Sequence, residues 1–156
     1  MKPFLLLCAL AGTLAMCVGV QTAAANDREG CKKVHAVGVG QDLGGGNTTA
    51  TITHGGPLNG TTNAHFDITG GVPPVLTFAG TIVFTTKHGT LTVDLAGTLN
   101  IATGEFNATG PITGGTGKFE GSTGTLTFSG VENLTTGAFT ETITGTLCRA
   151  DDGGDD

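Results

Sequence analysis

One acidic residue, Glu141, stands inside an apolar alternating pattern near the C-terminus. It is in phase with Phe139, Ile143 and Leu147, and threonines occupy the positions between them. Because successive side chains of a β-strand point to opposite faces, this spacing places the carboxyl on the apolar face. Burial would raise its pKa, so the carboxyl could donate a proton or polarise a reacting group. Glu141 is therefore the candidate catalytic residue, and the alternative is a structural carboxylate near a barrel mouth or one paired with Lys, Arg or Thr.

A glycine-rich segment with a lysine, residues 112–124, could suggest phosphate binding. A P-loop needs a glycine five positions before its Gly-Lys pair and Ser or Thr directly after it. Here an isoleucine stands at that distance before Gly117-Lys118, and a phenylalanine follows. The glycine spacing also fails the dinucleotide fingerprint. We therefore expect a connection between two strands, in which residues 118–120 form one helical turn that places Phe119 over the end of the fold.

The histidines do not predict a metal site. His54 and His88 are in phase with inward residues but occur where strands end, and no ligand spacing links them, so we expect exposed histidines at the barrel rims. His65 and Asp67 share the face opposite Phe66, which predicts that both are solvated. Neither a metal nor a cofactor is expected.

Two cysteines, Cys31 and Cys148, remain near opposite ends of the chain once a leader is removed. An even pair in an exported protein predicts a disulfide, whereas zinc sites use closely spaced pairs. The bridge would bring the first strand next to the last.

The N-terminus predicts export. Residues 1–25 combine a positive start, an apolar run and an Ala-Ala-Ala cleavage pattern, which is typical of a signal peptide. A lipoprotein anchored at Cys17 is the alternative. We expect one domain over residues 26–150, followed by a disordered acidic tail at 151–156 that lacks the ligand spacing of a calcium loop. The predicted location is secreted or periplasmic.

Composition excludes two classes of partner. The formal net charge is −6, with 7 Lys and Arg against 13 Asp and Glu. Nucleic acids and anionic lipids are bound through clustered cations, which this chain lacks. The oligomeric state stays open.

Period-two alternation dominates the rest of the chain, and no segment has a helical apolar stripe. It predicts eight strands near residues 34–41, 48–54, 61–69, 75–86, 90–100, 105–113, 123–130 and 138–148. Closure into an antiparallel barrel would remove exposed edges, so an all-β, eight-stranded barrel is predicted, with a β-sandwich as the alternative.

Inward apolar residues of these strands are the candidate ligand-binding wall. They are Phe78, Ile82, Phe84, Leu91, Val93, Leu95, Phe128 and Ile143. Because the chain has no Trp or Tyr, we expect a smooth aliphatic lumen with limited aromatic stacking.

Two segments carry a family resemblance. Residues 112–124, ITGGTGKFEGSTG, resemble the glycine-rich hairpin of the allene oxide cyclase-like barrels, which are related to dirigent proteins. Residues 54–61, HGGPLNGT, resemble secreted bacterial members. The likeness implies an eight-stranded, calycin-like barrel with an apolar cavity and, in enzymatic relatives, cofactor-free cyclisation of a hydrophobic substrate.

Three functions are compatible with these features. The first is a secreted protein that binds a hydrophobic small molecule, lipid or terpenoid-like, in its lumen. The second is a cyclase or isomerase that folds such a substrate in the same cavity. The third is a structural envelope protein, which would apply if side chains fill the lumen.

Overall fold

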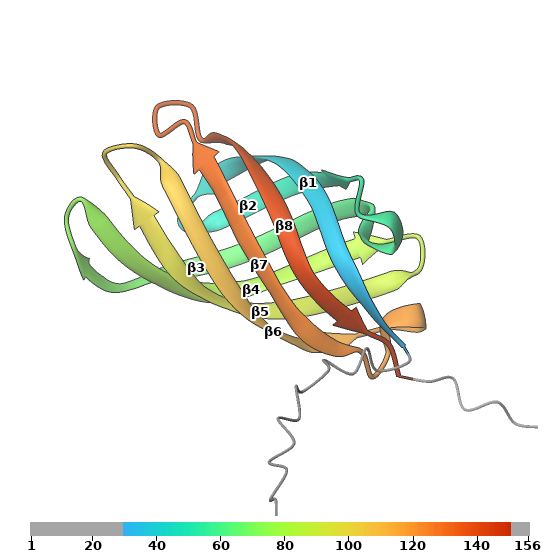
Figure 1. The fold of residues 1–156 in the computed structure, drawn as a ribbon. Coiled ribbons are helices and arrows are strands. Elements are labelled where there is room, and N and C mark those ends of the chain that lie inside the picture. Colours follow the sequence, from blue (N-terminus) through green and yellow to red (C-terminus); the bar gives the residue numbers. More distant parts are fainter. Residues whose placement is uncertain (1–29, 151–156) are drawn as a thin grey trace, which may run out of the picture.

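The computed structural model describes residues 30–150, which form a closed antiparallel β-barrel of eight strands (Figure 1). Each strand pairs with its neighbours in the sequence, and the last strand pairs with the first. The strands are β1 (Cys31–Gly44), β2 (Asn47–Thr53), β3 (Gly60–Val72), β4 (Val75–Thr86), β5 (Gly89–Asn100), β6 (Glu105–Gly115), β7 (Thr123–Glu132) and β8 (Ala138–Cys148). The predicted barrel is confirmed, and the sandwich alternative is wrong.

The alternating sequence explains the two faces of the wall. On β8, Phe139, Ile143 and Leu147 are buried, whereas the threonines between them are exposed. Threonine suits the outer face because its branched side chain favours extended backbone and its hydroxyl stays in water. The inward side chains form one continuous hydrophobic core.

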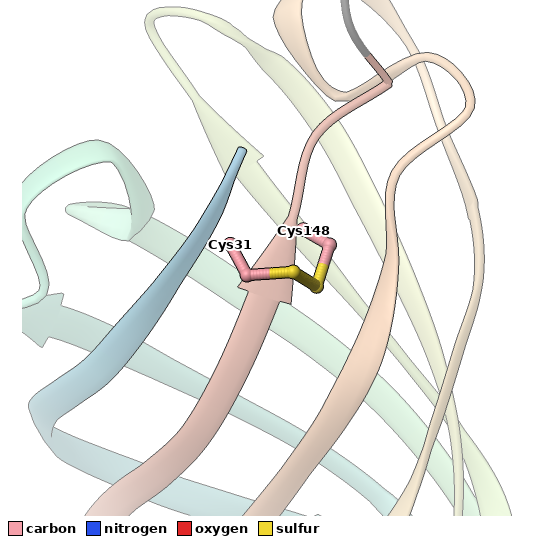
Figure 2. Close-up of a disulfide and its surroundings, with 2 residues drawn as sticks. All are labelled: Cys31 and Cys148. Atoms are coloured by element: carbon pink, nitrogen blue, oxygen red, sulfur yellow. A yellow bond between two sulfur atoms is a disulfide. The ribbon is translucent and has the colours of Figure 1, made fainter. Parts of the chain in front are cut away.

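A disulfide joins Cys31 to Cys148, 117 positions apart in the sequence (Figure 2). The two cysteines occupy opposite positions in the register between β1 and β8. The predicted disulfide between the first and last strands is therefore confirmed. Disulfides are typical of oxidising, extracytoplasmic compartments.

The two ends of the barrel differ. At one end, here called the closed end, lie the β4–β5 turn, the first and last residues of the barrel and two short 3₁₀ helices, η1 (Gly56–Leu58) and η2 (Gly117–Phe119) (Figure 1). Leu58 and Phe119 are completely buried there. The expected helical turn that places Phe119 over the barrel end is confirmed. The other end, here called the mouth, carries the β1–β2, β3–β4, β5–β6 and β7–β8 hairpins.

The proposed signal peptide and lipoprotein cysteine, within residues 1–25, and the acidic tail, residues 151–156, lie outside the described residues. Among residues 30–150, no helix is long and apolar enough to span a membrane.

Candidate functional site

A cavity of about 440 Å³ occupies the mouth half of the barrel. Its floor consists of inward residues from the middle of the strands, and the next inward residues toward the closed end are packed core. Ile82, Leu95, Ala108 and Phe128 are apolar residues at this level, and Thr62 and Glu141 are the polar ones. The barrel therefore resembles a cup, open at the mouth and filled below.

The structure divides the predicted ligand-binding wall into two groups. Phe78, Ile82, Leu95 and Phe128 line the cavity, so their binding role stays a prediction. The other four residues have no surface exposed to it, because each is completely buried in the layer below; these are Phe84, Leu91, Val93 and Ile143.

Aromatic side chains line the cavity in the mouth half of the barrel. The expectation of a smooth aliphatic lumen with little stacking surface is therefore wrong. Phenylalanines from five strands line the cavity, namely Phe66, Phe78, Phe106, Phe128 and Phe139. Phe66 and Phe78 make an edge-to-face pair with ring centroids 5.3 Å apart, and Phe106 and Phe139 make another at 6.0 Å. The sequence has few aromatic residues, but strand register gathers most of them in this cavity.

Glu141 lies on the cavity floor. Its side chain is 8% exposed, and the next inward residue of β8, Ile143, is completely buried. The hydrogen bonds and ion pairs of residues 30–150 include none to the Glu141 carboxyl. Desolvation by burial raises its pKa from 4.5 to about 7. The predicted inward position is confirmed, whereas its catalytic role stays a prediction.

Two glycines of β1 make room for the large inward side chains of β8. Gly38 pairs with Glu141 and Gly40 with Phe139 in the strand register. A Cβ atom on Gly38 would lie 2.6 Å from Glu141 Oε1, and one on Gly40 would overlap the Phe139 ring. The Glu141 side chain therefore lies across β1 because that strand has no side chain at this level.

Acidic residues surround the mouth of the cavity. Asp42 on β1, Asp67 on β3 and Glu132 on β7 all line it. Desolvation raises the pKa of Glu132, and the negative charge of Asp42 raises it further. His65 Nε2 lies 3.7 Å from Asp67 Oδ1, with both side chains exposed as predicted.

Positive charge lies at the opposite end. All five Lys and Arg residues between positions 30 and 150 occur at the closed end, namely Lys32, Lys33, Lys87, Lys118 and Arg149. Several of them border a second, smaller hollow of about 310 Å³ together with His88. Partial desolvation, and then the neighbouring cations, lower the pKa of His88. His54, at the same end, is exposed as predicted, whereas His88 is partly buried, so its predicted full exposure is wrong.

This separation of charge follows from topology. In an antiparallel barrel, every second connection lies at the same end, so residues near the chain ends and near positions 56, 87 and 118 must gather there. The positions of the lysines and arginines along the sequence therefore predict that they share one end of an antiparallel barrel, although the alternation of apolar residues alone does not. Within the described residues, no group of three or more His, Cys, Asp and Glu side chains could hold a metal ion.

Comparisons of the chain with protein-family models, curated proteins and solved structures found no match. The two segments that resemble allene oxide cyclase-like barrels form the β2–β3 and β6–β7 connections, each with one 3₁₀ helix over the closed end. Membership of that family stays a prediction, and function has to be argued from the cavity itself.

Proposed function

We propose that the protein is exported and binds a hydrophobic small molecule, such as a lipid or terpenoid-like compound, in the mouth half of its barrel. The observation that carries this proposal is the apolar cavity of about 440 Å³ with its wall of phenylalanines. Small-molecule sites typically occupy about 300–1,000 Å³, with mostly apolar walls and a few polar groups. An unfilled lumen of this size also argues against a purely structural barrel.

The mouth hairpins support entry of an apolar compound. Each carries an exposed aliphatic side chain, namely Leu43, Val72, Ile101 and Leu134. Exposed apolar side chains gathered at one end of a barrel are typical of surfaces that contact apolar molecules. A hydrophobic ligand would therefore meet apolar surface before it enters the cavity.

A variant that fills the cavity tests the proposal. Ala108 lines the cavity on β6, and its replacement by Phe puts a ring into the open space. Ala96 faces outward on the neighbouring strand β5, so Ala96→Phe is the matched control. We expect the neutral fluorescent probe N-phenylnaphthylamine to bind the wild type and the control but not Ala108→Phe, with both variants folded by circular dichroism. Equal binding by Ala108→Phe, or no binding by the wild type, would contradict the proposal.

Cofactor-free cyclisation or isomerisation is a second candidate, because a carboxyl with a pKa of about 7 faces an apolar cavity. Such a group can act as acid or base near neutral pH, which is typically worth about 10²- to 10⁴-fold in rate. Candidate cyclisable lipids and terpenoids would be incubated with the wild type and Glu141→Gln. Conversion that falls by this factor in the variant supports the enzyme, and undiminished conversion removes Glu141 from the mechanism.

Export is supported by the Cys31–Cys148 disulfide. Mass analysis of the natively produced protein should show an N-terminus near residue 26. A lipidated N-terminal Cys17 would favour the anchored alternative instead.

A further inference from the structure

The charge of the lumen, in addition to its shape, restricts what can bind there. Glu141 is more than nine-tenths buried and lies on the cavity floor, and no side chain or backbone group of residues 30–150 hydrogen-bonds to its carboxyl. A buried carboxylate is normally paired with a cation or with several donors. Within residues 30–150, the Glu141 carboxyl can therefore be paired only by a group that enters the cavity, either water or part of a ligand.

We propose that the lumen binds an amphiphile whose protonated amine meets the Glu141 carboxylate while its apolar body lies against the phenylalanine wall. This inference rests on the proposed ligand-binding function and specifies the chemistry of the ligand. Binding a hydrophobic anion, such as a fatty acid, is the outcome that it excludes.

The charged groups around Glu141 all favour a cation. The strands beside β8 are β1 and β7, and their charged residues that line the cavity are Asp42 and Glu132. Lys32, in the same phase of β1, lies at the closed end, away from this cavity. Asp67 adds a third acid at the mouth. None of the lysines and arginines between residues 30 and 150 lines this cavity. A ligand carboxylate would meet like charges only, whereas an ammonium group would be attracted along its whole path.

The aromatic wall favours the same ligand. Phe106 and Phe139 line the cavity together with Phe128. Phe106 pairs with Gly130, which is the β7 partner of Glu141 in the register. A cation within about 6 Å of an aromatic ring face is attracted by the ring's quadrupole. The phenylalanines can therefore hold an apolar chain and also stabilise an ammonium group, which an aliphatic wall could not do.

Three probes with the same tail and different head groups test the proposal, namely decylamine, decanol and decanoate. Their affinities for the exported chain would be measured near pH 8, where both the amine and Glu141 are ionised. We expect decylamine to bind most tightly and decanoate most weakly. Glu141→Gln should weaken decylamine binding by about 10- to 100-fold, the value of a hydrogen bond to a charged group, and leave decanol nearly unchanged.

The pH dependence gives a second test that needs no variant. Near pH 5 Glu141 is protonated, so decylamine should bind at least about tenfold more weakly than near pH 8, while decanol should bind equally at both. In turn, saturating decylamine should lower the pKa of Glu141 measured from its carboxyl carbon by NMR. A pKa that stays unchanged in the complex would contradict the direct contact.

The outcomes separate this inference from the function on which it rests. If decanoate binds as tightly as decylamine, or if Glu141→Gln keeps the preference for the amine, the head-group assignment is wrong. The lumen would still be a ligand site if Ala108→Phe abolishes decanol binding. If none of the three probes binds in a manner that Ala108→Phe blocks, both proposals are wrong.

Discussion

Glu141 should make the protein less stable as the pH rises through neutrality. Its pKa is about 7 in the folded chain against 4.5 in an unperturbed carboxyl. Below about pH 4.5 it is protonated in both states and contributes no pH dependence. Between these values the unfolded chain releases the proton while the folded chain keeps it, so the free energy of unfolding falls. Above about pH 7 the full cost of a buried carboxylate is present.

The magnitude follows from the same two pKa values. Each pKa unit corresponds to about 1.4 kcal/mol, so ionisation of Glu141 lowers the free energy of unfolding by about 3 kcal/mol. Glu141→Gln keeps the size of the side chain but cannot ionise. Relative to the wild type, the variant should therefore gain about 3 kcal/mol between pH 4 and pH 8. Any cost of burying the amide adds a constant and leaves this gain unchanged.

The assay is denaturant unfolding of both proteins across this pH range, with the disulfide intact and no ligand present. Comparison with the wild type at each pH cancels the contribution of every other group, because the two proteins share them. Glu120, exposed at the closed end, provides the control variant Glu120→Gln, which makes the same substitution at a side chain that is not buried. A difference between Glu141→Gln and the wild type that stays constant with pH would refute the inference that Glu141 is buried without a partner.

Three other variants test the parts of the barrel that surround the cavity. Replacing Cys31 and Cys148 together by Ser should lower the free energy of unfolding by about 4–5 kcal/mol, because the bridge closes a long loop; a loss below about 1 kcal/mol would contradict that role. Phe119→Ala should cost about 3–5 kcal/mol in denaturant unfolding, because its ring is completely buried; a near-neutral effect would show that this ring does not seal the closed end. Gly38→Ala should displace the Glu141 carboxyl and weaken decylamine binding more than decanol binding, and equal weakening of both ligands would contradict the contact.

The strands were predictable because their signal is local. Alternation located all eight and gave the inward face of several, including the phase of Glu141. The largest difference at a strand start is in β1, which begins at Cys31 instead of Val34. Its first residues alternate poorly in polarity and are extended because they pair with the end of β8. A partner more than one hundred positions away leaves no local pattern.

The position of each residue along the barrel axis could not be predicted from alternation. Phe84 and Phe128 are both inward, yet only Phe128 reaches the cavity. The difference arises because the two 3₁₀ helices fill one end and the strands are staggered around the wall. Alternation specifies which face a side chain occupies but carries no information about that stagger. For the same reason, the sequence did not show that most phenylalanines gather in one half of the lumen.

The closed half of the barrel stabilises the fold, whereas the mouth half contains features that destabilise it. The binding proposal requires this arrangement, because a binding site needs an open cavity within a stable frame. The disulfide, the buried Phe119 and the packed layer below the cavity stabilise the closed half. The mouth half keeps an open space and a carboxylate that destabilises the fold when ionised. A cationic ligand that supplies the missing partner would remove this destabilisation, so it should stabilise the protein more near pH 8 than near pH 5. By reciprocity, acidification should release the ligand, because protonation of Glu141 and binding of an ammonium group compete for the same carboxyl.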